Sequence, residues 1–191
     1  DGSVDIDVQF GYTGDYTAVL SGIQASDGIP SNVSAADGLE VFCGYIPAMT
    51  HLRFATFDED TTTPGADDID LRLFYGPSCS AISAQLGASG GVTSDESIDV
   101  ADAPAGYYWF VIDYWAAASG TDIDYTAWIQ PVFGDNVNTL VTAPVSAAAN
   151  TSDTVTVDYF DLTDGTRYLG VVQHEDSVGE MSRTIIDIDT Q

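Results

Sequence analysis

The sequence has no lysine and only four arginines among its 191 residues, against 30 aspartates and glutamates, so its formal net charge is −26. Such a chain repels phosphates and anionic lipid headgroups, because it lacks the cations that would release their counterions. We therefore expect no nucleic-acid partner. No apolar run approaches the roughly 20 residues of a membrane-spanning helix, so we also expect no membrane insertion.

Cysteine and histidine are equally scarce, with two of each. Two separated histidines and two cysteines cannot build a zinc, haem or iron–sulfur site. Cys43 and Cys79 form no Cys-x-x-Cys pair, and their simplest use is one disulfide, which predicts an oxidising, extracellular environment. Closing that loop would stabilise the fold by roughly 3–4 kcal/mol. The alternative is two buried thiols in a reducing cell.

What the sequence has in abundance is period-two alternation, typical of β-strands, with almost no helical periodicity. In the run 68–73, Ile69, Leu71 and Leu73 share one face, as a half-buried strand requires. The run 107–112 is apolar on both faces and predicts a central strand covered on both sides. A hydrophobic content of 45% suffices for a core. The sequence predicts an all-β protein built from sandwiches or jelly rolls.

A change in composition near 133–136 predicts a domain boundary. The aromatic-rich residues 31–133 form one predicted β-sandwich module. Residues 134–191 offer only about four strands, which is thin for an independent sandwich. We therefore predict that strands from residues 1–30 complete this second module and that the first module is inserted into it.

Acidic side chains crowd a short loop in the middle of the chain. Two groups flank residues 61–66, and their mutual repulsion would be relieved by a hard cation. The pattern is no EF-hand, because Thr63 and Ile69 stand at its sixth and twelfth positions. The prediction is a calcium site, weighed against solvated carboxylates screened by salt, and its candidate ligands are Asp58, Asp60, Asp67, Asp68 and Asp70.

A possible nucleophile motif, Gly-x-Ser-x-Gly, surrounds Ser89. The motif needs a strand-to-helix turn, but the residues that follow indicate another strand. Neither His51 nor His174 lies near an orienting motif. We predict no catalytic residue in this chain.

Several segments together resemble a known family, and they occur in its order: 11–18, 46–58, 67–71, 103–109, 124–126 and 162–170. They resemble the non-catalytic C-terminal extensions of secreted bacterial subtilisin-like serine proteases. These include a jelly-roll module similar to pre-peptidase C-terminal domains, which would correspond to residues 31–133. The last segment is similar to the tyrosine corner of an immunoglobulin or fibronectin type III sandwich, which would correspond to residues 134–191.

The resemblance implies a function without catalysis. The triad would lie in an upstream domain, whose Gly-Thr-Ser-Met-Ala type motif has no counterpart here. The implied roles are secretion, stabilisation of the protease and binding of protein substrate, and the acidic loop would hold calcium. The partners would be the protease domain, the protein substrate or both. Exposed aromatics would bind the substrate, and the candidates are Tyr12, Tyr16, Trp115 and Trp128. The alternative is that these rings belong to the core.

A second hypothesis is a calcium-dependent structural protein that self-associates, such as a surface-layer, adhesin or filament subunit. Its joints would be donated edge strands, and the predicted donors are residues 4–10 and 184–188.

Overall fold

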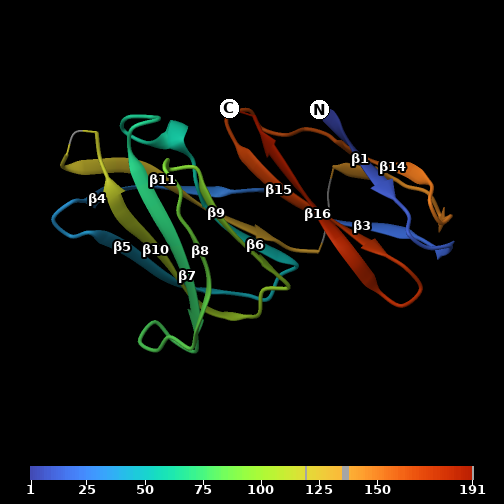
Figure 1. The fold of residues 1–191 in the computed structure, drawn as a ribbon, viewed down its shortest axis with the longest axis horizontal. Coiled ribbons are helices and arrows are strands. Elements are labelled where there is room, and N and C mark those ends of the chain that lie inside the picture. The colour runs from blue at the N-terminus through green and yellow to red at the C-terminus, as the bar shows by residue number, and fades with distance from the viewer. Residues whose placement is uncertain (119, 135–137, 191) are drawn as a thin grey trace. The chain divides into compact units, whose positions relative to one another are not determined.

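The computed structural model describes residues 1–118, 120–134 and 138–190, and in these residues the protein is all-β (Figure 1). The one helical element described is the short 3-10 helix η1 (Asp58–Asp60). No helix in the described ranges has the length and hydropathy of a membrane span. The strands form two compact units: unit 1 comprises 1–26 and 132–191, and unit 2 comprises 27–131. Asp135 and Asn136, where the composition changes, lie outside the described residues.

Unit 2 contains two four-stranded sheets. One has the order β5 (Leu39–Ile46), β10 (Gly106–Ala116), β7 (Asp68–Gly76) and β8 (Ala84–Ser89). The other has the order β4 (Asp27–Ser34), β11 (Asp122–Val132), β6 (His51–Thr56) and β9 (Glu96–Ala101). The rings of Phe54 and Phe110 meet edge-on at 5.0 Å between the sheets. Their facing apolar sides exclude water, as in a β-sandwich.

Strand β10 is covered on both faces, as its sequence predicts. Tyr108, Phe110 and Ile112 point into the sandwich, whereas Trp109 lies on the outer face and is still only 7% exposed. The loop after β7 passes close to the Trp109 ring. Gly76 lies between them: a Cβ atom on this glycine would be 3.0 Å from the ring and only 2.1 Å from the backbone oxygen of Ala81 in the loop. Trp109 is thus held beneath a loop on the outside of the sheet.

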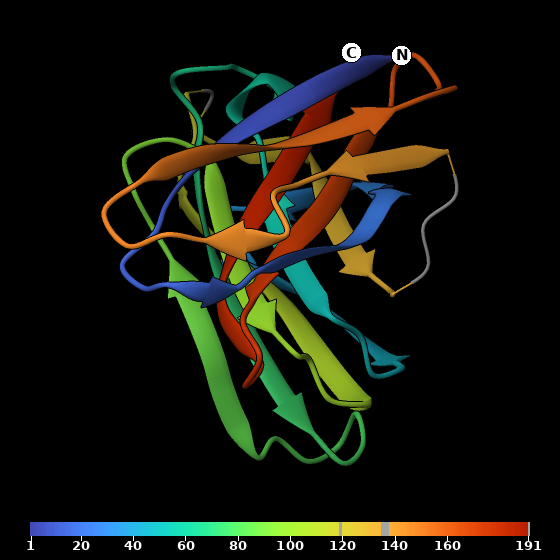
Figure 2. The ribbon, with the colours of Figure 1, turned by 90° about the vertical axis from the view of Figure 1, so that its right-hand side faces the viewer.

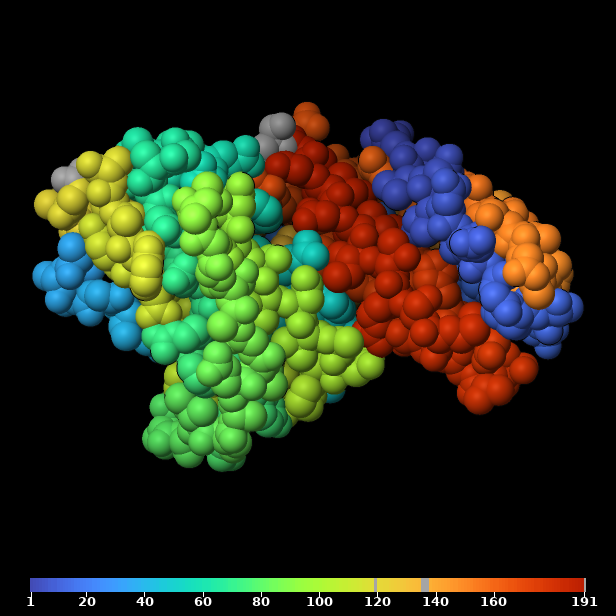
Figure 3. Space-filling view, viewed as in Figure 1, coloured from blue at the N-terminus to red at the C-terminus, as the bar shows by residue number. Residues whose placement is uncertain are grey.

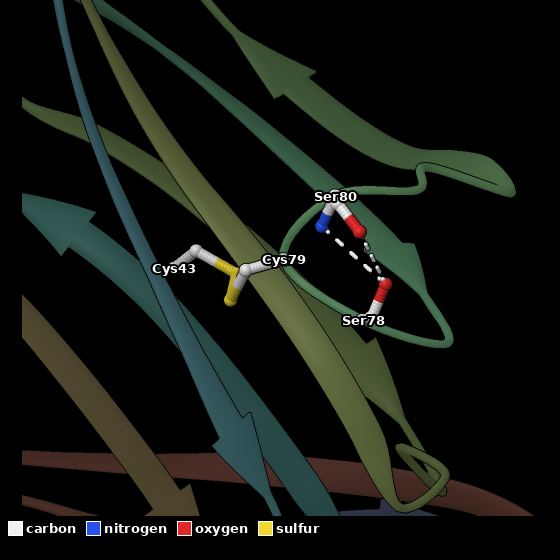
Figure 4. Close-up of a disulfide and its surroundings, with 4 residues drawn as sticks. All are labelled: Cys43, Ser78, Cys79 and Ser80. Carbon is white, nitrogen blue, oxygen red and sulfur yellow. Dashed lines mark hydrogen bonds between the residues drawn. A yellow bond between two sulfur atoms is a disulfide. The ribbon is translucent and has the colours of Figure 1, made fainter.

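A disulfide holds that loop in place. Cys43 on β5 is bonded to Cys79 in the loop, with their Cα atoms 5.9 Å apart (Figure 4). Ser78 and Ser80 on either side are hydrogen-bonded to each other at 3.0 Å. The predicted disulfide is confirmed, and the alternative of two free thiols is not what the structure contains.

Unit 1 is built from strands of both chain ends. One sheet has the order β1 (Gly2–Gln9), β14 (Ser152–Tyr159) and β12 (Thr139–Thr142), and Figure 2 shows β1 and β14 side by side. The other has the order β16 (Glu180–Asp189), β15 (Arg167–Glu175) and β3 (Thr17–Ala25). A small ladder joins β2 (Gly14–Asp15) to β13 (Ser146–Ala147). The core between the sheets is apolar, and Val155, Val157 and Val172 are fully buried in it.

The segment before β15 makes the interaction expected of a tyrosine corner. The backbone N–H of Thr163 donates a hydrogen bond of 2.8 Å to the hydroxyl of Tyr168, five residues later. The Tyr168 ring is buried in the core of unit 1. The hydroxyl therefore fixes the entry of the chain into β15.

Candidate binding surfaces

Trp115 is the most prominent exposed aromatic side chain, with 69% of its surface accessible. The register between β10 and β7 shifts between Tyr114 and Ala116, so Trp115 sits at a bulge and has no partner residue in β7. A bulge turns a side chain out of the regular alternation. This geometry explains why an indole at the end of a central strand points into solvent.

Trp115 lines a groove of about 500 Å³ on unit 2, together with residues of β7, β8 and β10. In this groove the guanidinium of Arg72 donates from Nε to Asp113 Oδ2 at 2.6 Å. That hydrogen bond raises the pKa of Arg72, although desolvation opposes the rise. Asp70 lies in the same groove, and burial followed by the charge of Asp113 raises the pKa of its carboxyl. The groove therefore combines an aromatic ring, an ion pair and a carboxylate.

Apolar side chains extend outward along the same sheet. Leu39, Val41 and Tyr45 on β5 are all exposed. Tyr45 packs edge-on against Tyr107 at 5.5 Å. The register pairs Val41 with Val111 and Leu39 with Asp113, so the row leads toward the groove beside Trp115. Exposed apolar rows of this kind are typical of interaction sites.

Two of the predicted surface aromatics are buried, so those predictions are wrong. Tyr16 is 4% exposed, because its ring packs at 5.0 Å against Phe10 in the core of unit 1. Trp128 is 8% exposed, because its indole N–H donates to Asp60 Oδ2 at 2.7 Å. Both residues hold the fold together. Tyr12, the fourth candidate, is half-buried, and its hydroxyl donates to the backbone oxygen of Asp15 at 2.9 Å.

Three of the five predicted calcium ligands accept hydrogen bonds from N–H groups of the protein. Asp58 Oδ2 accepts a short hydrogen bond from the backbone N–H of Gly65, and Asp60 accepts from Trp128. Asp67 is almost completely buried and accepts from the backbone N–H groups of Thr63 at 2.7 Å and Ala118 at 2.9 Å. Hydrogen bonds thus offset the repulsion that led us to expect a cation at these three residues.

Asp68 and Asp70 lie on β7, close enough to Glu96 at the start of β9 for their charges to act on it. Burial raises the pKa of Glu96, and the charges of Asp70 and Asp68 raise it further. Hydrogen bonds from Ser89 and Gly91 act in the opposite direction. One buried oxygen, Asp68 Oδ1, has no hydrogen-bond partner among the described residues. Within those residues, no group of three or more metal-binding side chains is close enough to hold an ion.

Ser89, His51 and His174 are hydrogen-bonded to three different partners. Ser89 lies at the end of β8 and donates a short hydrogen bond to Glu96. His51 bonds Asp99 Oδ1 through Nε2 at 2.7 Å, and His174 bonds Tyr16. Burial works to raise the pKa of Asp99, but hydrogen bonds from His51 and Arg53 outweigh it and the pKa is lowered.

Comparison with protein-family models, with curated proteins and with solved structures gives no match. The candidate surfaces are therefore interpreted from their geometry and chemistry.

Proposed function

We propose that this chain is a non-catalytic accessory module of an extracellular subtilisin-like protease and that it binds protein substrate. The observation that carries the substrate-binding role is the exposed Trp115 beside its groove. Aromatic anchors of this kind supply a large share of interface energy at low entropy cost. The mixed lining of an ion pair and a carboxylate suits a polypeptide, whose backbone and side chains offer both donors and acceptors.

Two features support an extracellular site of action. The disulfide stabilises unit 2 where thiols are oxidised, and its loop covers Trp109. The large excess of carboxylates is tolerated where dissolved cations screen it.

We also propose that calcium binds at Asp68 and Asp70. The unpartnered buried oxygen of Asp68 supports this, since a cation would satisfy it, and so do the raised pKa values of both carboxyls. Asp58, Asp60 and Asp67 do not fit a calcium site, because protein N–H groups hold their oxygens. Calcium here would stabilise the start of β7 and the groove beside it.

The substrate-binding role is tested by sedimenting the chain with particles of heat-denatured casein. We expect the Trp115→Ala variant to bind about tenfold more weakly or worse, which is the usual effect of losing an aromatic anchor. Val92→Ala, which truncates a loop residue of unit 2 that is also highly exposed, is the matched control and should bind like the parent chain. Equal binding by the Trp115→Ala variant would overturn the proposal.

A further inference from the structure

Two open strand edges border one groove in unit 1. β1 is the outermost strand of its sheet and β16 is the outermost strand of the other. A groove of about 350 Å³ lies between them, lined by residues 6–9 of β1, by Phe10 after it, and by Met181, Ser182 and Thr184 of β16. Figure 3 shows the atoms of β1 and β16 next to each other on one face of the molecule.

The backbone of β1 is available for pairing along this groove. Within the described residues β1 pairs with β14 alone, so its other edge has no neighbouring strand. The groove is lined by four consecutive residues of β1, both those that point into the core and those that point outward. Such an edge presents N–H and C=O groups that can accept another strand. The same holds for β16, which in the described part of the chain pairs with β15 alone.

The terminal strands are already part of unit 1. Residues 4–10 and 184–188, which the sequence suggested as donated strands, already pair within the chain and carry core residues such as Ile186. Donating them would break up unit 1.

The groove contains aromatic rings at one end. Phe10 meets Tyr12 edge-on at 6.3 Å and Tyr16 at 5.0 Å, and all three line the groove. Met181 opposite is exposed and can adapt to different side chains. An aromatic pocket of this kind accommodates the apolar stem of a long side chain, and it attracts a cation at the end of that stem.

Carboxylates lie beside the groove. Asp7 lines it and is exposed on the outward face of β1. Burial, together with the charges of Asp176 and Asp15, raises the pKa of Tyr12. The groove therefore lies in a negative potential, which favours a basic occupant.

A second copy of this chain is a poor occupant. It would place the same acidic edge against the groove, and like charges across paired strands are destabilising. It has no lysine, and each of its four arginines already has a carboxylate partner in the chain: Asp99 for Arg53, Asp113 for Arg72, Asp189 for Arg167 and Glu180 for Arg183.

We propose that the groove between β1 and β16 binds an extended segment of a partner protein that carries an arginine or lysine. The segment adds to the open edge of β1 as a strand. Its basic side chain lies against the half-buried ring of Tyr12, which Phe10 supports from the core, with its charge near Asp7. This site is in unit 1 and is independent of the Trp115 groove of unit 2, so either proposal can fail without the other.

The experiment measures the dissociation constant of a fluorescent peptide with the intact chain. The peptide has about nine residues, the length of a strand, in which valine alternates with threonine around one central arginine. Replacing that arginine with uncharged citrulline should weaken binding about tenfold, and raised salt should weaken binding of the arginine peptide. In a paired strand, alternate backbone N–H groups point to opposite edges, so two N-methylated peptides can be made. The peptide methylated on the N–H groups that face β1 should not bind.

Protein variants then locate the site. Asp7→Asn and Tyr12→Ala should each weaken binding several-fold. The thermal melt of Asp7→Asn should be unchanged, and circular dichroism checks that Tyr12→Ala, which loses packing against Phe10, is folded at the temperature of the binding assay. Asp164→Asn, which neutralises an exposed carboxylate of unit 1 outside the groove, should bind like the parent chain. The proposal is overturned if the arginine peptide does not bind, if both N-methylated peptides bind as well as the unmodified peptide, or if Asp7→Asn and Tyr12→Ala have no effect.

Discussion

The hydroxyl of Tyr16 lies 2.6 Å from Nδ1 of His174, although 158 residues separate them in the sequence. On the other side of the ring, Nε2 of His174 is 2.9 Å from the hydroxyl of Thr184. The imidazole on β15 therefore links the residue before β3 to β16 inside unit 1. Burial lowers the pKa of His174 from its ordinary value of 6.5, against the opposing charge of Glu180.

Unit 1 should lose stability in mild acid because of His174. The unfolded chain binds a proton on this histidine below about pH 6.5, whereas the folded chain resists it until its lowered pKa is reached. The contribution to the free energy of unfolding is therefore full above pH 6.5 and decreases as the pH falls, by at most about 1.4 kcal/mol per pH unit. Urea denaturation of the parent chain and of His174→Gln across this range measures it. Identical pH dependence in the two proteins would contradict the assignment.

The disulfide should matter chiefly to unit 2. All three tryptophans lie in unit 2, so tryptophan fluorescence reports on its unfolding. Replacing both Cys43 and Cys79 with alanine opens a loop of 36 residues and should lower the free energy of unfolding by about 4 kcal/mol. The matched control is Ser78→Ala with Ser80→Ala, which changes the same loop and leaves the disulfide intact. An equal loss in this control would assign the stabilisation to the serines.

Asp67 should be among the most sensitive carboxylates of the chain. Its side chain is almost fully buried and accepts two backbone N–H bonds, so Asp67→Ala leaves both donors without their acceptor. The expected loss is about 2–4 kcal/mol, measured by chemical denaturation. Asp27→Ala, at an exposed position of unit 2, is the comparison and should cost much less. A small effect of Asp67→Ala that becomes large only when calcium is added would point instead to a metal ligand.

Calcium should raise the melting temperature through Asp68 and Asp70. Binding to the folded state alone stabilises it by about 2.7 kcal/mol at a calcium concentration one hundred times Kd. We expect this shift in the parent chain after EDTA treatment and calcium readdition, and we expect none in the Asp68→Asn, Asp70→Asn double variant. Asp58→Asn should melt earlier yet keep the calcium shift. A shift that sodium chloride of matched ionic strength reproduces would reduce the effect to screening.

Much of the fold follows from local patterns, because strand alternation needs only neighbouring residues. The run 107–112 predicts a strand covered on both faces, and β10 is that strand. Partners across the chain do not follow from local patterns. Tyr16 and Trp128 looked like available aromatics, but their burial depends on His174 and Asp60, which no spacing rule connects to them.

The candidate site shows the same limit. Clustering of the five aspartates along the sequence indicated one site, yet backbone N–H groups take up Asp58 and Asp67 while Asp70 faces Asp113 across paired strands. The register of β10 with β7 places Asp70 opposite Asp113. A bulge in the same pairing exposes Trp115. The groove between β1 and β16 depends on sheet order, which the sequence does not reveal.

The most direct test of the proposed function is hydrogen–deuterium exchange of the intact chain with and without a soluble unfolded protein, such as carboxymethylated casein, at saturation. The account predicts slower exchange at residues 113–116 and along β5, where Trp115 and its apolar row lie. The Trp115→Ala variant should lose that protection. Unchanged exchange at these residues in a saturated complex would contradict the account.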